Sequence, residues 1–139
     1  MKKTMTVHVG PRLTFADFTA ADFNQRGVYL VYRVNSEDGR FRLIYIGKSD
    51  NVSDRVSESH HRYQEWVNWA YGDNANLRFS LVSLQSEDDL ERCEATLIYG
   101  LQPPINVDCK NSFAYDETEI VFEGRRVCGV GGIVVSRTA

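Results

Sequence analysis

The chain has 139 residues, of which 42% are hydrophobic, so it suits one domain with its own core. No apolar stretch approaches the roughly 20 residues of a membrane-spanning helix, and the N-terminal lysines are not followed by the apolar segment of a signal peptide. We therefore expect a soluble, cytoplasmic protein with no membrane partner, and because its net charge is −3, it can bind a polyanion only through a local basic patch.

The first well-patterned segments predict an antiparallel β-hairpin. Residues 14–24 are typical of a short helical or irregular segment, and residues 27–35 follow as a strand rich in Val and Tyr. Residues 36–40, Ser-Glu-Asp-Gly-Arg, have the composition of a turn, and residues 41–49 form a second strand. Two strands joined by a short polar loop are expected to pair antiparallel.

The position of the turn predicts which residues of the hairpin face each other. With the loop centred near Glu37, we expect Tyr29 to lie opposite Tyr45. The same register places Gly27 opposite Gly47. Because side chains alternate along each strand, both tyrosines are predicted to project from the same face of the hairpin.

The segment after the hairpin predicts one long helix that begins at Asn51 or Ser53 and runs to residue 70. Its apolar side chains recur at helical spacing, at Val52, Val56, Tyr63, Val67 and Ala70. One flank of this stripe is expected to carry Arg55, Ser59, Arg62 and Trp66. On such a helix His60 and His61 point in different directions, so they cannot form an i, i+4 metal pair.

Three further elements complete the chain. Residues 77–84 alternate as a third strand, and residues 86–101 favour a second helix. We expect Ser86 to be the N-cap of this helix, with an aspartate three residues on, and the helix to end before the prolines that follow it. Residues 118–135 predict a hairpin that turns near residues 123–124.

This order of elements predicts one α/β domain of the α+β type, with a small central antiparallel sheet flanked by helices and an extra C-terminal β-hairpin. We expect three segments within it. Residues 1–26 form an N-terminal extension, residues 27–106 form the core, and residues 107–139 form a C-terminal extension that packs on the same domain.

The second helix places a carboxylate among apolar side chains. The neighbours of Glu94 on one helical face are Leu90, Cys93, Leu97, Ile98 and Leu101. A charged group in a core-facing stripe is costly unless it is paired or bound. Two interpretations of Glu94 stay open: it lies at the margin of the stripe, where it reaches solvent or an arginine, or it binds a metal or acts in catalysis.

The order of these residues resembles the GIY-YIG nuclease family. Gly27-Val28-Tyr29 matches the first signature, with Val for the middle Ile, and Tyr45-Ile46-Gly47 matches the second. Arg55 follows at the family's usual distance, and Glu94 occupies the family's metal-binding position. Asn106, in Pro-Pro-Ile-Asn, stands where the family carries its proline-led asparagine. A GIY-YIG-like fold is therefore expected over the segment between the first signature and this asparagine.

The resemblance implies a catalytic set. Glu94 would hold one divalent cation, Mg²⁺ or Mn²⁺, and a single carboxylate suits Mg²⁺ because that ion keeps most of its waters. Arg55 would bind the scissile phosphate as a planar fork. Tyr29 or Tyr45 would help to activate the attacking water, and since a free phenol has a pKa of about 10, that role needs positive charge nearby.

The resemblance also implies a DNA-binding set, which consists of Gly47, Lys48, His60, Arg62 and Asn106. Gly47 would let the DNA backbone approach closely, and Asn106 would position its loop or a phosphate. Some relatives carry a histidine one turn after the arginine; Ser59 has that place here, with His60 next. The expected basic patch consists of Arg40, Arg42, Lys48, Arg55 and Arg62.

Two functions from different classes follow. The first is a metal-dependent endonuclease that hydrolyses phosphodiester bonds in DNA. The second is a non-catalytic module on a GIY-YIG-like fold that binds nucleic acid or a protein. The intact set of tyrosines, arginine, glutamate and asparagine favours the endonuclease, because a binding module has little need of a buried carboxylate.

Overall fold

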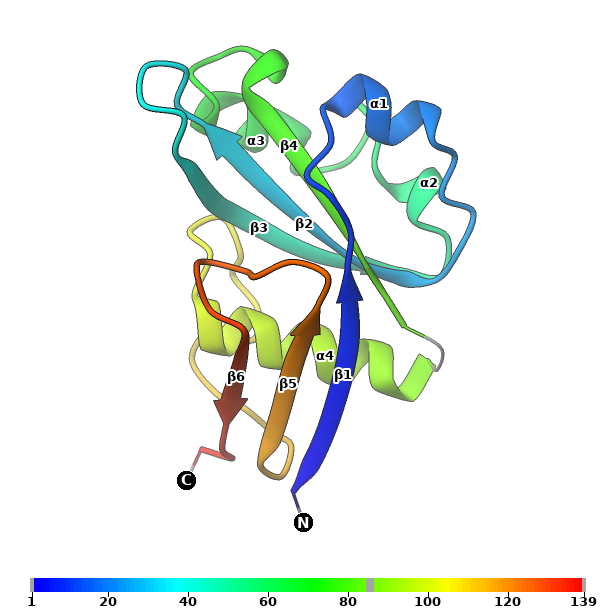
Figure 1. Cartoon of the computed structure of the whole chain (residues 1–139), viewed down its shortest axis with the longest axis vertical. Helices are drawn as coiled ribbons and strands as arrows, with labels where there is room; N and C mark the ends of the chain where they lie inside the picture. Colours follow the sequence, from blue (N-terminus) through cyan, green and yellow to red (C-terminus); the bar gives the residue numbers. More distant parts are fainter. Residues whose placement is uncertain (1, 85–86, 139) are drawn as a thin grey trace.

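The computed structural model describes residues 2–84 and 87–138, which form a curled six-stranded sheet with helices packed against it (Figure 1). The strand order is β3-β2-β4-β1-β5-β6. The strands are β1 (Lys3–Val9), β2 (Gly27–Val34), β3 (Phe41–Ser49), β4 (Leu77–Ser83), β5 (Thr118–Glu123) and β6 (Gly132–Val135). The helices are α1 (Phe15–Ala20), α2 (Val52–Arg55), α3 (Tyr63–Trp69) and α4 (Glu87–Leu101), with a 3₁₀ turn at Asn74–Asn76. The expected mixed class of sheet and helices is confirmed.

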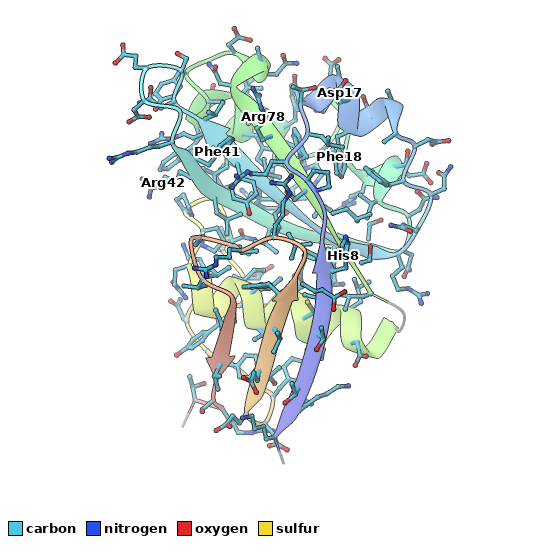
Figure 2. All side chains as sticks on the ribbon, viewed as in Figure 1. His8, Asp17, Phe18, Phe41, Arg42 and Arg78 are labelled. Atoms are coloured by element: carbon cyan, nitrogen blue, oxygen red, sulfur yellow. The ribbon has the colours of Figure 1, made fainter. Side chains whose placement is uncertain are left out.

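The two faces of the sheet bury different cores. On one face α4 packs across β2, β3, β5 and β6, with Leu30 and Leu97 among the buried side chains. On the other face α1, α2 and α3 cover β2, β3 and β4, and Trp66 and Phe79 lie in that core. Phe18 of α1 points toward β4 in Figure 2, and its ring centroid lies 5.5 Å from that of Phe79.

The strand β1 was not expected from the sequence. It lies between β4 and β5 and so connects the C-terminal hairpin to the rest of the sheet. Met5, Val7 and Val9 are buried and alternate with exposed residues, which is the ordinary signal of a half-buried strand. β1 pairs antiparallel with β4 and parallel with β5. The sheet is therefore mixed: the expected antiparallel pairing holds for β3, β2 and β4, whereas the parallel pair of β1 and β5 was not expected.

The hairpin of β2 and β3 is confirmed, but its expected register is wrong. Tyr29 pairs with Gly47, and Tyr45 pairs with Val31, followed by a β-bulge. The slip from the expected register is two residues, so no side chain changes face. The rings of Tyr29 and Tyr45 accordingly lie on the same face, with their centroids 6.3 Å apart.

This register explains why the second signature ends in glycine. A Cβ built at residue 47 would overlap the phenol ring of Tyr29, which is fully buried. The ring fills the space that the missing side chain leaves, as aromatic residues do beside glycines in sheets. That side of Gly47 is therefore closed to a DNA backbone, contrary to the role expected for it.

The single helix expected over residues 51–70 is wrong. α2 ends at Arg55, because Val56 adopts an extended conformation with ψ 97°, and α3 begins only at Tyr63. The intervening segment turns His60 into the core, where its ring stacks on that of His61 at 4.6 Å. The two histidines therefore do not diverge. Trp66, expected on the helix flank, is fully buried.

The C-terminal elements agree with their predicted types. α4 covers the expected segment, and β5 and β6 pair antiparallel, although the loop between them runs over residues 124–131 and is longer than a tight turn. The expected N-cap, Ser86, lies outside the described residues. Among residues 2–84 and 87–138, no helix combines the length and the hydrophobicity needed to cross a membrane.

We predict that Gly47→Ala destabilises the fold by about 1–3 kcal/mol, because the new methyl group must displace the buried ring of Tyr29. Gly131→Ala is the matched control, since no atom lies within 4 Å of the position that its Cβ would take. Urea unfolding of both variants measures the effect. Equal stability of the two variants would contradict the proposed packing of Tyr29 on Gly47.

Candidate functional site

The candidate site lies at the outer edge of β3, where three adjoining hollows share their lining residues. The first, of about 120 Å³, is lined by Tyr45, Arg62, Glu94 and Asn106 among others. The second, of about 340 Å³, shares Glu94 with it and adds Lys48. The third, of about 240 Å³, shares Lys48 with the second and adds Arg55. The structure thus brings most of the expected site residues together on one surface.

Glu94 is half-buried on α4 and faces this surface. Burial raises the pKa of its carboxyl to about 7, an effect that Lys48 opposes and the nearby carboxylates of Glu91 and Asp108 reinforce. Within the described part of the chain, no hydrogen bond or ion pair joins Glu94 to another residue. The interpretation that Glu94 forms a structural ion pair with an arginine is therefore not supported in this part of the chain.

Tyr29 is held by His60. The Tyr29 hydroxyl lies 2.8 Å from Nε2 of His60, and Nδ1 of His60 accepts the backbone N–H of Arg62 at 2.9 Å. Because Nδ1 accepts that bond, the neutral imidazole carries its proton on Nε2 and donates it to the Tyr29 oxygen. Burial, assisted by the positive charges of Arg55 and Arg62, lowers the pKa of His60 to about 4, so the ring is neutral at physiological pH.

The break between α2 and α3 decides which residue meets the tyrosine. Ser59 is exposed and shares a hydrogen bond with Ser57 at 2.9 Å, whereas His60 is buried against Tyr29. His60 therefore takes the position beside the first signature tyrosine. The sequence contains both residues but does not reveal this choice, which depends on the end of α2.

Both signature tyrosines are protonated in the protein without a bound cation. Burial is the main cause that raises the pKa of Tyr29 and of Tyr45. Arg55 lowers the pKa of Tyr29 through a hydrogen bond and its charge, but burial outweighs it. The positive charge of the protein alone thus does not prepare either phenol to act as a base.

Asn106 completes the edge of the sheet. Its side-chain oxygen accepts the N–H of Ile46 at 2.9 Å, and its amide nitrogen donates to the carbonyl of Ile46 at 2.8 Å. The N–H of Ile105 adds a bond to the carbonyl of Ile44 at 3.0 Å. The loop after α4 thereby occupies the open edge of β3, so of the two roles expected for Asn106 the structure shows the positioning of this loop.

The expected basic patch is divided. Lys48 lies 3.5 Å from a carboxylate oxygen of Glu91, and Arg62 lies 2.6 Å from one of Glu65. Arg55 is exposed and forms no ion pair with a carboxylate of the described chain. Arg42 lies at the start of β3, with its guanidinium 5.1 Å from the ring centre of Trp69, and Arg40 stands beside Asp38. The last two arginines therefore do not belong to the Glu94 surface.

Two carboxylates of the site were not identified from the sequence. Glu91 lies one turn before Glu94 on α4, and Asp108 lies two residues after Asn106. The helical spacing of the two glutamates is a signal for the first of them. The second has no signal of its own, because only the folded loop brings it to the cavity.

The site fits a cation held by one carboxylate and water. Within residues 2–84 and 87–138, no three His, Cys, Asp or Glu side chains converge to hold a metal, and Mg²⁺ does not require such a cage. No family model matches the chain, nor does any curated protein or solved structure. The function must therefore be inferred from the residues of this surface.

We predict that His60→Gln removes a pH-dependent loss of stability. The unfolded histidine binds a proton below pH 6.5, while the folded one stays neutral down to about pH 4, so wild type loses stability as the pH falls through this window. The loss from this group is about 2–3 kcal/mol between pH 7 and 4.5. Glutamine does not titrate and retains an N–H for Tyr29.

Urea unfolding of both proteins at the two pH values measures this difference. The opposing titration of Glu94 is common to both proteins and cancels. Parallel pH curves for wild type and variant would show that His60 is not buried as a neutral ring.

Proposed function

We propose that this protein is a metal-dependent endonuclease that hydrolyses phosphodiester bonds in DNA. The observation that carries the proposal is the half-buried carboxyl of Glu94, with a pKa raised to about 7, which faces a cavity together with Tyr45. Burying a carboxylate costs stability, because the charged form loses its hydration. A shifted carboxyl in a cleft is typical of a functional site, and the resemblance to GIY-YIG nucleases supports the same role.

Arg55 is the proposed phosphate clamp. It is exposed beside Lys48 at the mouth of one of the three hollows and has no carboxylate partner in the described chain. A planar guanidinium donates two parallel N–H bonds to a phosphate. Its interaction with Tyr29, whose pKa it lowers, indicates that its head group lies near the tyrosines.

Glu94 is the residue that would hold a divalent cation, Mg²⁺ or Mn²⁺. Such a cation, when bound, supplies positive charge at the scissile phosphate and lowers the pKa of water. Lys48 lies close enough to Glu94 to lower the pKa of its carboxyl and so favours the ionised form that the cation requires. Glu91 and Asp108 add negative charge around the same position.

The tyrosines differ in access to the cavity. Tyr45 lines the cavity, whereas Tyr29 does not line it, is fully buried and forms a hydrogen bond with His60. We therefore assign to Tyr45 the contact with the attacking water, and to Tyr29 the positioning of Tyr45. The N–H of His60 and the charge of Arg55 both favour negative charge on the Tyr29 oxygen, so they assist any transfer of a proton through the pair.

A second candidate function is a non-catalytic module that binds nucleic acid or a protein. The protonated state of both tyrosines in the cation-free protein favours it, because neither phenol is prepared to act as a base. The two candidates differ in one observable, which is cleavage of plasmid DNA in Mg²⁺ or Mn²⁺ compared with EDTA. Cleavage supports the first candidate, and binding without cleavage supports the second.

We predict that Glu94→Gln separates stability from activity. The raised pKa means that the folded state disfavours the carboxylate, so the wild type loses stability as the pH rises from about 4.5 to about 7. The variant should therefore be at least as stable as wild type at pH 8. It should lose plasmid cleavage, together with any rise of Tm in Mg²⁺, since a ligand stabilises only the state that binds it.

Glu123→Gln is the matched control for this experiment. It removes an exposed carboxylate at the end of β5, outside the three hollows, and should retain cleavage. Thermal melts with and without Mg²⁺, beside a plasmid gel, compare the three proteins. A Glu94→Gln protein that is destabilised and still cleaves DNA would remove Glu94 from the proposed mechanism.

We predict that Arg55→Ala lowers the rate of cleavage by about 100-fold or more, the usual effect of removing one donor from a developing charge. Arg55→Lys should also be poor, because an ammonium group cannot make the two-pronged contact. The fold should persist, since Arg55 is exposed. Arg125→Ala, an exposed arginine in the loop between β5 and β6, is the control. Wild-type rates for Arg55→Ala would exclude the phosphate clamp.

A further inference from the structure

A hollow of about 600 Å³, larger than the three beside Glu94, lies away from them at the start of β3. Its walls come from β2, β3, the end of α4 and the loop between β5 and β6, which arches toward β3 in Figure 1. Leu43 and Leu101 form apolar parts of the lining, and Pro104 closes one side. The volume falls in the range of cavities that bind small molecules and cofactors.

This cavity differs from the Glu94 surface in the sign of its charge. Arg12 and Arg42 line it, and no Asp or Glu is among its described lining residues, whereas each hollow of the Glu94 surface contains a carboxylate. Neither arginine forms an ion pair within the part of the chain that the structure describes. The guanidinium of Arg42 lies against Trp69, whereas that of Arg12 lies against the lining residues Phe41 and Tyr32. In a protein with a net charge of −3, the uncompensated guanidinium of Arg12 favours an anionic ligand in this cavity.

The aromatic side chains add a stacking surface. The guanidinium of Arg12 lies over the ring of Phe41, 4.0 Å from its centre, and 5.7 Å from the ring centre of Tyr32. Phe41 remains 41% exposed, so part of its ring is accessible to a ligand. Aromatic rings and arginine planes are the surfaces on which nucleobases stack.

Tyr32 supplies a polar group aimed at the same space. The residue is only 3% exposed, yet it lines the cavity, and its hydroxyl has no hydrogen-bond partner among the described residues. The hydroxyl oxygen is not among the fully buried polar atoms that lack a partner, so it is accessible and can donate to a ligand or a water in the cavity. Gln102 adds an acceptor, because its amide nitrogen donates to two backbone carbonyls while its oxygen has no hydrogen-bond partner among residues 2–84 and 87–138.

We propose that this cavity binds a nucleotide, with the base stacked on Phe41 and the phosphate held by the guanidinium of Arg12. A phosphate alone would leave the aromatic wall and the Tyr32 hydroxyl unused. An apolar ligand would leave the guanidinium of Arg12 without a counter-charge. A nucleotide satisfies both parts of the lining, because it joins a flat polar base to an anion.

The cavity stands apart from the proposed catalytic surface and does not depend on cleavage. Phe41 and Tyr45 are four residues apart on β3, a distance of about 13 Å along an extended strand. Pro104 lines the nucleotide cavity, and Asn106, two residues later, lines the Glu94 hollow. The ligand is therefore either a free nucleotide or an unpaired nucleotide of a strand that crosses this edge of the sheet.

The proposal is tested by equilibrium binding in EDTA, so that cleavage has no influence on the result. The probes are deoxyadenosine monophosphate, deoxyadenosine, inorganic phosphate and a short single-stranded oligonucleotide with one fluorescent base. We expect the mononucleotide to bind more tightly than the nucleoside or phosphate. Arg12→Met and Phe41→Leu should each weaken its binding about tenfold or more. Arg125→Met, the control for total charge, should bind within about twofold of wild type.

Competition distinguishes the two sources of the nucleotide. If the mononucleotide displaces the oligonucleotide, the cavity takes a nucleotide of a strand; if both bind without competition, it takes a free nucleotide. Either result supports the proposal. Equal affinity for phosphate and mononucleotide would overturn it in favour of a simple anion site. Unchanged binding by Arg12→Met and Phe41→Leu, with circular dichroism showing that both variants are folded, would also overturn it, as would no binding of any nucleotide.

Discussion

The packing of Tyr29 on Gly47 is the constraint on which the rest of the site depends. Because the two residues are paired across the hairpin, the phenol ring lies over the glycine. Its hydroxyl then reaches His60, in the segment between α2 and α3. His60 must leave a helical path to bond that hydroxyl, and this break separates α2 from α3. Arg55, at the end of α2, is thereby placed beside the tyrosine.

The site combines buried polar groups, which are kept neutral, with an open edge, where charged groups are accessible. Burial keeps Tyr29 and His60 in their neutral forms, which suits a well-packed core. Glu94 and Tyr45 stand at the margin of that core, where a cation or a phosphate can reach them. Asn106 holds the loop over the edge of β3 and so separates this surface from the second cavity. Rigid support behind an accessible margin is the arrangement that a catalytic or binding site requires.

Charge is distributed unevenly along β3. Carboxylates surround Glu94 at one end, where a cation is favoured, whereas Arg12 and Arg42 stand without carboxylates at the other end. The net charge of the chain therefore says little about what either end binds, because each cavity responds to its own lining. A strand of nucleic acid that lies across the edge of the sheet would meet both environments, and the proposed nucleotide cavity adds a contact beyond the Glu94 surface.

The sequence by itself determined the strands β2, β3 and β4, the helix α4, the common face of Tyr29 and Tyr45, and the position of Glu94 among apolar neighbours. These features follow from local periodicity, which acts within one element. Only the tertiary structure decided the hairpin register, the break before His60, and the burial of Trp66, because each depends on a partner distant in the chain. The charge of each cavity was likewise decided by the fold, since Arg12 and Arg42 come from separate segments that the curled sheet brings together.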